Sequence, residues 1–237
     1  MCGRYTLTRQ NLREVAELLG AAVSADDAAA HRPRYNIAPS SPGWLVVAGA
    51  GGRQIVRGRW GFPVPFGPRQ DDPVGLINAR AETIAEKPTF RGALAHGRCG
   101  VVADGFFEWQ GSKGHKRPLW FHPPGGELLV FAGLWREFTD PDTGEIERRF
   151  AILTTDANRL VAPVHDRMPA ILAPGALARW LAPAPGERAA FGAFAAGLQD
   201  ILGPAPEGAL EATPVSPRVN DARFDDPLCV AAEPTLL

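Results

Sequence analysis

Short apolar runs separated by glycine and proline dominate the hydrophobic pattern of this chain, and they predict more strands than helices. Such runs lie at residues 44–48, 54–60, 98–103, 119–122, 128–132 and 150–154, with a short strand expected near 214–219. The segments 111–117 and 139–145 are typical of hairpin loops. We therefore expect an α+β protein whose strongly bent, mainly antiparallel sheet forms a barrel-like core with flanking helices.

Helical spacing of apolar residues is confined to a few segments. It runs from Thr8 to Leu19, where Asn11 and Glu14 are placed to form a capping box and Gly20 supplies a stop. Two further helices are predicted at 174–181 and 187–202, split by a Pro/Gly break. The pattern assigns residues 21–34 to a surface loop and 61–75 to an ordered one.

Length and composition favour one domain with a substantial core. The chain has 237 residues, of which 45% are hydrophobic and 22% charged, as in an ordinary globular protein. We find no internal repeat and no linker, so we expect one domain over residues 2–220. Residues 221–237 would form a C-terminal extension packed on the domain or trailing from it. No coiled-coil pattern is present, which favours a monomer.

Charge and cysteine content narrow the class of protein. The net charge of −1 does not indicate a nucleic-acid binder overall, although a local stripe of Lys and Arg would serve. Three cysteines, Cys2, Cys99 and Cys229, lack paired spacing, which argues against a disulfide framework. The five histidines form no ligand pair with cysteine, so we expect no metal and no cofactor. With no signal-peptide segment and no membrane-spanning run, we expect a cytoplasmic protein without a membrane partner.

The first residues carry the most distinctive chemistry. A small residue at position two usually permits removal of the initiator methionine, Met1. Cys2 would then carry a free α-amine and a thiol on the same residue. Such an aminothiol condenses with an aldehyde to an imine, which the thiol closes to a thiazolidine. The reference pKa values are about 7.7–8.0 for the amine and about 8.5 for the thiol. Arg4, two residues on, is expected to increase the thiolate fraction.

Three other segments combine polar residues with glycine or aromatic residues. Asn78 lies in a run with Arg80 and Glu82, Glu108 lies in an aromatic cluster, and His165 is followed by Asp166. Each has an ordinary structural interpretation as well. Asn78 suits a turn, Glu108 suits a satisfied strand end, and His165 with Asp166 suits a local hydrogen-bonded pair.

Taken together and in order, these segments resemble the SOS response-associated peptidase (SRAP) family of abasic-site processing proteins. The resemblance extends from Cys2 to Asn220 and includes residues 2–5, 34–39, 59–61, 77–83, 103–109, 131–135, 152–158, 164–169 and 214–220. It implies a protein that binds single-stranded DNA at abasic sites and captures the ring-opened sugar aldehyde as a thiazolidine crosslink. The crosslink would protect the lesion, and the protein would associate with the nucleoid during DNA damage.

By position in the family pattern, Cys2 matches the nucleophile, and Asn78, Glu108 and His165 match the other active-site residues. Desolvation among aromatic residues should raise the pKa of Glu108, which suits proton transfer during opening of the closed sugar or reversal of the crosslink. His165 exchanges protons near neutral pH. Asn78 is suited to bind the sugar or the Cys2 amine. The name "peptidase" refers to self-removal of a leading residue, here Met1, although an ordinary aminopeptidase would serve equally.

Binding DNA requires phosphate contacts, and arginine suits them because its planar fork binds phosphate bidentately. Our candidates are Arg4, Arg80 and Arg167, with Arg59 and Arg98 in reserve; the alternative is that some form ion pairs, for example to Glu82 or Asp166. Pro39, Phe66 and Trp109 are candidates for contacts to unpaired bases, Trp109 more as a wall than as a stacking platform. Residues 62–66 lack the tryptophan that the family often has there.

Two other functions remain open. An N-terminal-nucleophile amidohydrolase, such as a glutamine amidotransferase, also begins Met-Cys-Gly, but here Arg4 follows and no glutamine-binding segment matches; release of ammonia would distinguish it. A non-catalytic reader of modified DNA would bind without Cys2, and would therefore keep its full activity in a Cys2→Ala variant.

Overall fold

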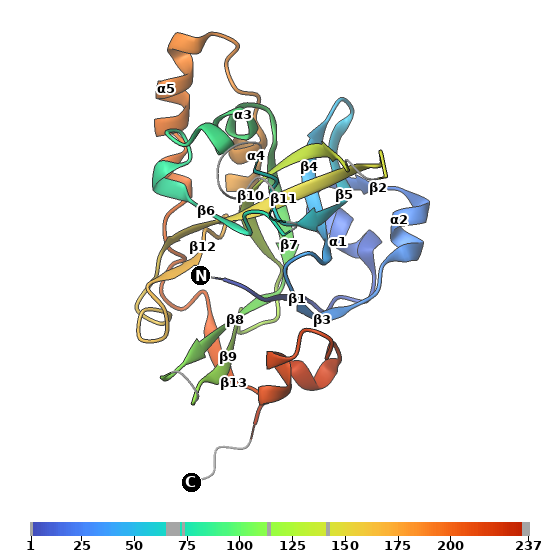
Figure 1. Ribbon diagram of the computed structural model, residues 1–237, viewed down its shortest axis with the longest axis vertical. Coiled ribbons are helices and arrows are strands. Elements are labelled where there is room, and N and C mark those ends of the chain that lie inside the picture. The colour runs from blue at the N-terminus through green and yellow to red at the C-terminus, as the bar shows by residue number, and fades with distance from the viewer. Residues whose placement is uncertain (1, 65–71, 73, 113–114, 141–142, 234–237) are drawn as a thin grey trace.

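Two mainly antiparallel sheets form the framework of the fold (Figure 1). The structure is a computed structural model that describes residues 2–64, 72, 74–112, 115–140 and 143–233. Its strands are β1 (Tyr5–Leu7), β2 (Ala21–Val23), β3 (Arg34–Ile37), β4 (Pro42–Gly49), β5 (Gly52–Trp60), β6 (Asn78–Arg80), β7 (Arg98–Ala103), β8 (Gly105–Gln110), β9 (Arg117–His122), β10 (Leu129–Thr139), β11 (Ile146–Asp156), β12 (Arg167–Pro169) and β13 (Glu211–Pro214). Its α-helices are α1 (Leu12–Leu18), α2 (Ala25–Ala30), α3 (Pro88–His96), α4 (Ala176–Leu181) and α5 (Arg188–Ala196).

The larger, eight-stranded sheet closes on itself. Its strands follow the order β12-β11-β10-β7-β4-β5-β2, and β11 also pairs with β5 in parallel, through Arg149↔Arg59 and Phe150↔Trp60. This second pairing closes β11, β10, β7, β4 and β5 into a barrel. Farther along β11, the short strands β6 and β12 take over as its neighbours. The α+β fold with a barrel-like core and flanking helices is confirmed.

The smaller, five-stranded sheet has the order β13-β9-β8-β1-β3 and lies beside the barrel. Its central strand β1 pairs with β8 through Tyr5↔Phe106 and with β3 through Tyr5↔Ile37. The N-terminal end of the chain consequently enters between the two sheets (Figure 1). This arrangement places the first residues in the interior of the molecule.

Alternation along the barrel strands separates two cores. On β10 and β11, Phe131 and Ile152 face one cluster with Tyr5 and Trp60, whereas Ala132 and Leu153 face a second cluster. The second cluster includes residues of α3, α4 and α5, which lie together at one end of the barrel (Figure 1). Because both faces of these strands are buried, their sequences are continuously apolar rather than alternating.

Arg98 joins two helices to the barrel. It lies on β7, is 7% exposed, and donates to the carbonyl oxygens of Trp180 at 2.6 Å, Ala95 at 3.1 Å, Leu94 and Ala182. These carbonyls end α3 and α4, where intrahelical donors are missing. Arg98 is therefore a helix-capping residue, and its prediction as a reserve phosphate contact was wrong.

Helix boundaries follow their caps. Asn11 precedes α1, accepts from the Arg13 amide at 2.9 Å and donates to Glu14 at 3.0 Å, so the predicted capping pair is confirmed. The prediction of a loop at 21–34 was wrong. The segment contains β2, which pairs with β5 in parallel along its whole length, and α2, whose first turn is capped by Ser24. Both are too short to show a period. The last predicted helix ends at Ala196, and a 3₁₀ turn, Gln199–Ile201, follows.

The strands that sequence analysis missed are β2, described above, and β1, β3, β6, β8 and β12. They are short or carry the polar residues of the candidate site, which interrupt the apolar period. The two predicted hairpin loops do connect paired strands, β8 with β9 and β10 with β11. Part of the predicted loop at 61–75 lies outside the described residues.

Residues 221–233 pack on the rest of the chain. Asp225 accepts from the Asn36 amide at 2.8 Å and forms an ion pair with Arg34, and Cys229 is buried against Phe107. All three cysteines are free and buried. No helix in the described part of the chain is long and apolar enough to cross a membrane.

Candidate active site around Cys2

The pairing of β1 with β8 brings Cys2 and Glu108 together. Arg4 accepts a hydrogen bond from the Phe107 amide at 3.0 Å, which continues the ladder from Tyr5↔Phe106 toward the N-terminus. The stretch that precedes β1 therefore lies along β8 beside Glu108. Cys2 itself is 0% exposed, at the edge of the core cluster that contains Tyr5 and Trp60.

Asn78 holds Cys2 from the other side. Its Nδ2 donates to the Cys2 carbonyl oxygen at 2.8 Å. The residue before it is fixed by a bond from Trp60 Nε1 to the Ile77 carbonyl at 2.8 Å, and β6 is paired with β11 through Ile152. Asn78 Oδ1 is buried and has no hydrogen-bond partner among the described residues. It is thus an available acceptor directly beside Cys2.

Glu108 is a buried carboxyl group, 4% exposed. Burial raises the pKa of Glu108, and the nearby positive charges of His165 and Lys116 oppose this rise. The predicted increase in pKa is therefore confirmed, and desolvation is its main cause. Lys116 was not predicted from the sequence, because nothing in the hairpin segment that contains it indicates which way its side chain extends.

The environment of Cys2 favours the thiol over the thiolate. Burial strongly raises the pKa of Cys2, and the charge of Glu108 raises it further. The Arg4 guanidinium is not among the charges that lower this pKa. It donates instead to Asn36 Oδ1 at 2.9 Å and to the Val219 carbonyl at 2.8 Å. The prediction that Arg4 increases the thiolate fraction was wrong. A thiol in this position needs a neighbouring base to become a nucleophile, and Glu108 is the carboxyl group at hand.

His165 lies in the turn between β11 and β12, which is closed by a bond from its own amide to the Val161 carbonyl at 3.0 Å. Its Nδ1 accepts the Arg167 amide at 3.0 Å and lies 2.9 Å from a carboxylate oxygen of Asp166. A neutral ring that accepts at Nδ1 carries its proton on Nε2. A protonated ring would instead donate from Nδ1 to Asp166. The local pair expected from the sequence is therefore present. Its geometry is compatible both with a neutral ring, which accepts from Arg167, and with a protonated ring, which donates to Asp166.

The predicted DNA-contact residues differ in how they are engaged. Arg167 is 8% exposed and binds Glu82 at 2.8 Å, Asp156 at 2.6 Å and the Thr154 carbonyl at 2.6 Å. The ion-pair alternative is confirmed for Glu82, with Asp156 in place of Asp166. Arg80 is exposed. Arg167 thus has the geometry of a positioning residue, and Arg80 that of a surface contact.

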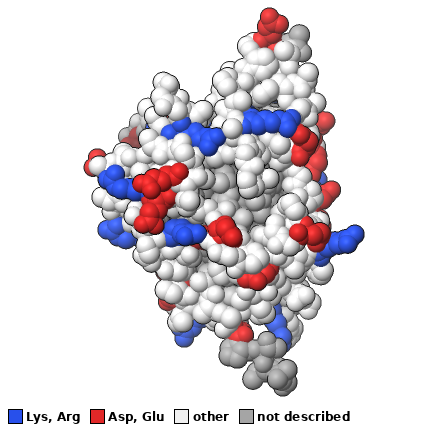
Figure 2. All heavy atoms as spheres, turned by 180° about the vertical axis from the view of Figure 1, so that it is seen from behind, with Lys and Arg blue, Asp and Glu red and all other residues white. Residues whose placement is uncertain are grey.

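The remaining candidates for contacts to DNA are Trp109, Pro39 and Phe66. Trp109 donates from Nε1 to Asn220 Oδ1 at 2.6 Å and is tilted against Phe107 at 6.5 Å, as a wall residue would be. Pro39 is half-buried in the loop before β4, and Phe66 lies outside the described residues. On the face of the molecule seen in Figure 2, basic side chains alternate with acidic ones. Charge on that face therefore does not mark a track for DNA.

Comparison with known proteins finds relatives over most of the chain. The chain is 33% identical over 230 residues to "Abasic site processing protein YoqW" of Bacillus subtilis, covering 96% of this chain and 97% of that protein. It is 32% identical over 234 residues to "Abasic site processing protein HMCES" of Gallus gallus, covering 84% of this chain and 66% of that protein.

Solved structures share the fold. A crystal structure of a protein from Bacteroides thetaiotaomicron superposes with a TM-score of 0.82 at 24% identity, covering 98% of this chain and all of that one. One from Bordetella bronchiseptica has a TM-score of 0.71 at 28% identity, covering 91% of this chain and all of that one. The profile of the family described as "SOS response associated peptidase (SRAP)" matches residues 1–222. The chain therefore belongs to the SRAP family, as its motifs indicate.

Proposed function

We propose that this protein captures abasic sites in single-stranded DNA by forming a thiazolidine between Cys2 and the ring-opened sugar. The observation that carries the proposal is the position of Cys2, which Asn78 holds at 2.8 Å through its carbonyl beside the buried Glu108. The printed names of the homologues, abasic site processing proteins, support the same substrate. The crosslink would shield the lesion from strand cleavage.

The chemistry balances with the loss of one water. After removal of Met1, the Cys2 amine attacks the aldehyde carbon, and the resulting carbinolamine loses water to give an imine. The thiol sulfur then attacks the imine carbon and the nitrogen takes up a proton, which closes the five-membered ring. An imine left open would permit β-elimination of the DNA strand, so fast closure by the thiol is what distinguishes capture from lyase activity.

Glu108 supplies the proton transfers in this scheme. Burial raises its pKa, which favours the protonated form that donates to the ring oxygen when the closed sugar opens. As a carboxylate it accepts the proton of the Cys2 thiol, whose own pKa is raised. The same group serves reversal of the crosslink. His165, which interacts electrostatically with Glu108, relays protons to and from it.

Asn78 and the arginines position the substrate. Asn78 Oδ1, an available buried acceptor, binds the Cys2 amine or a sugar hydroxyl without adding charge. Exposed Arg80 contacts a phosphate, whereas Arg4 and Arg167 hold the walls of the site through their protein partners. Pro39 and Trp109 border the bound strand. The protein acts as a monomer, and removal of Met1, by the chain itself or by an aminopeptidase, precedes the reaction.

Intact mass spectrometry tests the proposal. The protein is measured alone and after incubation with a single-stranded oligonucleotide that carries one abasic site. We expect loss of Met1 and a heat-stable adduct of protein plus DNA less one water, absent in Cys2→Ala. A wild-type protein with free Cys2 that forms no adduct would overturn the proposal. Ammonia release from glutamine in the same preparation would instead identify an amidotransferase, and full DNA binding without any adduct a reader.

A further inference from the structure

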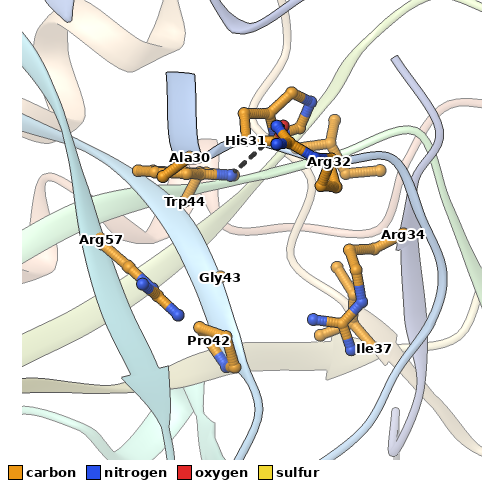
Figure 3. Close-up of a pocket in the computed structure, with 10 residues that line it drawn as sticks. Ala30, His31, Arg32, Arg34, Ile37, Pro42, Gly43, Trp44 and Arg57 are labelled. Carbon is orange, nitrogen blue, oxygen red and sulfur yellow. Dashed lines mark hydrogen bonds between the residues drawn. The ribbon is translucent and has the colours of Figure 1, made fainter. Parts of the chain in front are cut away.

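A hollow of about 230 Å³ lies away from the Cys2 site, between β3, β4 and β5. Leu7, Ile37 and Pro42 form apolar parts of its lining. Arg34 and Arg57 extend their guanidinium groups into it from opposite sides, with Trp44 along another edge (Figure 3). The lining contains no Asp or Glu. A hollow with apolar and aromatic walls and facing guanidinium groups suits a planar, anionic ligand.

The two arginines are available to different degrees. Arg34 forms an ion pair with Asp225 through Nε, which fixes its stem and leaves its terminal nitrogens directed into the hollow. Arg57 is exposed and makes no ion pair within the described part of the chain. It lies directly across from Trp44 in the pairing of β4 with β5. One oriented and one adaptable guanidinium therefore face the same space.

Trp44 is held as a rigid surface. Its Nε1 donates to His31 Nδ1 at 3.0 Å, and the opposite ring nitrogen of His31 lies 2.7 Å from the Arg9 carbonyl. The second bond requires a proton on Nε2, which leaves Nδ1 as the acceptor. An indole fixed in this way loses little freedom when a base stacks on it.

A buried hydroxyl nearby lacks a partner. Tyr5 is 0% exposed, and its hydroxyl oxygen has no hydrogen-bond partner among the residues described. It lies against Gly43, which lines the hollow, so closely that a Cβ at Gly43 would be 2.1 Å from it. Tyr5 does not itself line the hollow, so its hydroxyl belongs to the core beneath Gly43 and makes no contact with a molecule bound there.

A second hollow of about 390 Å³ shares Pro42 and Arg57 with the first. It is also lined by Arg148 and by Arg59, which forms an ion pair with Glu147 of the same lining at 3.3 Å. Ser40, on its edge, has a φ of 66°, a strained conformation that is concentrated at ligand sites. Arg57 and Arg59 are two residues apart on β5 and so share a face of the strand. Together the two hollows form a basic groove.

The groove lies within reach of a strand bound at Cys2. Leu7 lines the first hollow and is five residues beyond Cys2 along an extended segment, which spans about 16 Å at roughly 3.3 Å per residue. An abasic sugar attached to Cys2 is thus too far away to occupy the hollow itself. A nucleotide several positions along the same strand is at the correct distance.

We propose that this hollow binds a flanking nucleotide of the captured DNA strand, with the base against Trp44 and a phosphate between Arg57 and Arg34. The proposal rests on the proposed function for the identity of the strand. The groove would increase the affinity for DNA and set the length of strand that is needed for tight binding. It has no role in the covalent chemistry.

Fluorescence anisotropy tests the inference with oligonucleotides that carry a tetrahydrofuran abasic analogue, which has no aldehyde and reports binding alone. The strand flanking the analogue is lengthened from one to eight nucleotides on each side in turn. For Arg57→Ala and Trp44→Leu we expect about 5- to 20-fold weaker binding of long strands and unchanged binding of the shortest. The salt dependence of Arg57→Ala should fall by about 0.7 in log–log slope, one phosphate contact on a single strand.

The control is Arg13→Ala, which removes an exposed arginine of α1 that lines neither hollow. Arg57→Ala with wild-type affinity at every length, or with an equal loss at every length, would overturn the inference. Crosslinking of a true abasic site at saturating DNA is measured in parallel for the wild type and for Arg13→Ala, and the two should be equal. Absence of adduct in the wild type, with length-dependent binding intact, would overturn the proposed function and leave the nucleotide site standing.

Discussion

Asn78 donates a hydrogen bond of 2.8 Å to the carbonyl oxygen of Cys2, a residue 76 positions earlier in the chain. The bond ties the N-terminal segment to β6, and β6 in turn is fixed by its pairing with β11. It fixes the backbone of the nucleophile rather than its reactive atoms. Mobility of Cys2 is therefore controlled from the barrel, which makes the bond a direct target for mutation.

Asn78→Ala should slow adduct formation by about 10- to 100-fold, because misplacement of a reacting group by about 1 Å has effects of that size. The loss of unfolding free energy should be only about 0.5–1.5 kcal/mol, that of one hydrogen bond. Gln199→Ala is the matched control, since Gln199 also donates an amide bond to a carbonyl, that of Ala81 at 3.0 Å. Equal adduct rates in the two variants would contradict the positioning role. Single-turnover mass spectrometry and urea unfolding give the two measurements.

Glu108→Gln should slow crosslinking and its reversal by about 10²-fold or more, the usual contribution of a general acid–base group. The same variant should be more stable than the wild type at pH 7. Burial raises the pKa of Glu108 in the folded protein, so its favourable contribution is complete below the unfolded pKa of about 4.3 and is lost as pH rises through the higher folded value.

The difference in melting temperature between Glu108→Gln and the wild type should accordingly grow from pH 4 to pH 7 and vanish at the acidic end. In a chain of this size, each kcal/mol of stability corresponds to about 2–4 °C. Calorimetry across this pH range measures it. A Glu108→Gln variant that is less stable than the wild type at pH 7, or a stability difference that does not depend on pH, would show that the buried carboxylate does not destabilise the fold.

Arg167 and Arg80 should separate stability from DNA binding. Arg167→Met removes the cation shared by Glu82 and Asp156, whose side chains are 43% and 81% exposed. It should lower the unfolding free energy by about 1–2 kcal/mol, because the carboxylates left behind remain hydrated and the loss is that of the hydrogen bonds of Arg167. Arg80→Ala should leave stability within about 0.5 kcal/mol and weaken binding of the tetrahydrofuran oligonucleotide. Thermal melts measure the stability of both variants, and anisotropy measures their DNA binding. A stable Arg167→Met with weakened binding, together with an unstable Arg80→Ala that binds normally, would exchange the two roles.

Tyr5→Phe should stabilise the unliganded protein by about 1–2 kcal/mol. The substitution keeps the ring contacts with Trp60 at 5.2 Å and Phe131 at 6.2 Å and removes a buried hydroxyl that lacks a partner among the described residues, whose desolvation cost is of this order. Denaturant unfolding measures the change. Thr6→Val is the contrasting control, since the Thr6 hydroxyl donates to Asp104 at 2.6 Å and its loss should destabilise the fold.

The sequence by itself determined the strands with continuous apolar runs, the Asn11 cap, the absence of a disulfide framework, and the four segments around Cys2, Asn78, Glu108 and His165. These features are local: burial on both faces, a side chain that bonds its own helix, and a polar residue held in a short motif are all written in neighbouring positions. The family resemblance rests on the same local segments in order.

Tertiary structure alone decided what those residues touch. The pairing of β11 with both β5 and β6 closes the barrel and brings Asn78 to Cys2. The hydrophobic period of the sequence is local and does not indicate which distant strands pair. It also decided the engagement of the arginines: Arg98 caps two helices, Arg4 binds Asn36, and Arg167 pairs with Glu82. A guanidinium binds phosphate, carboxylate or carbonyl equally well, so only the acceptors that the fold places within reach select its role.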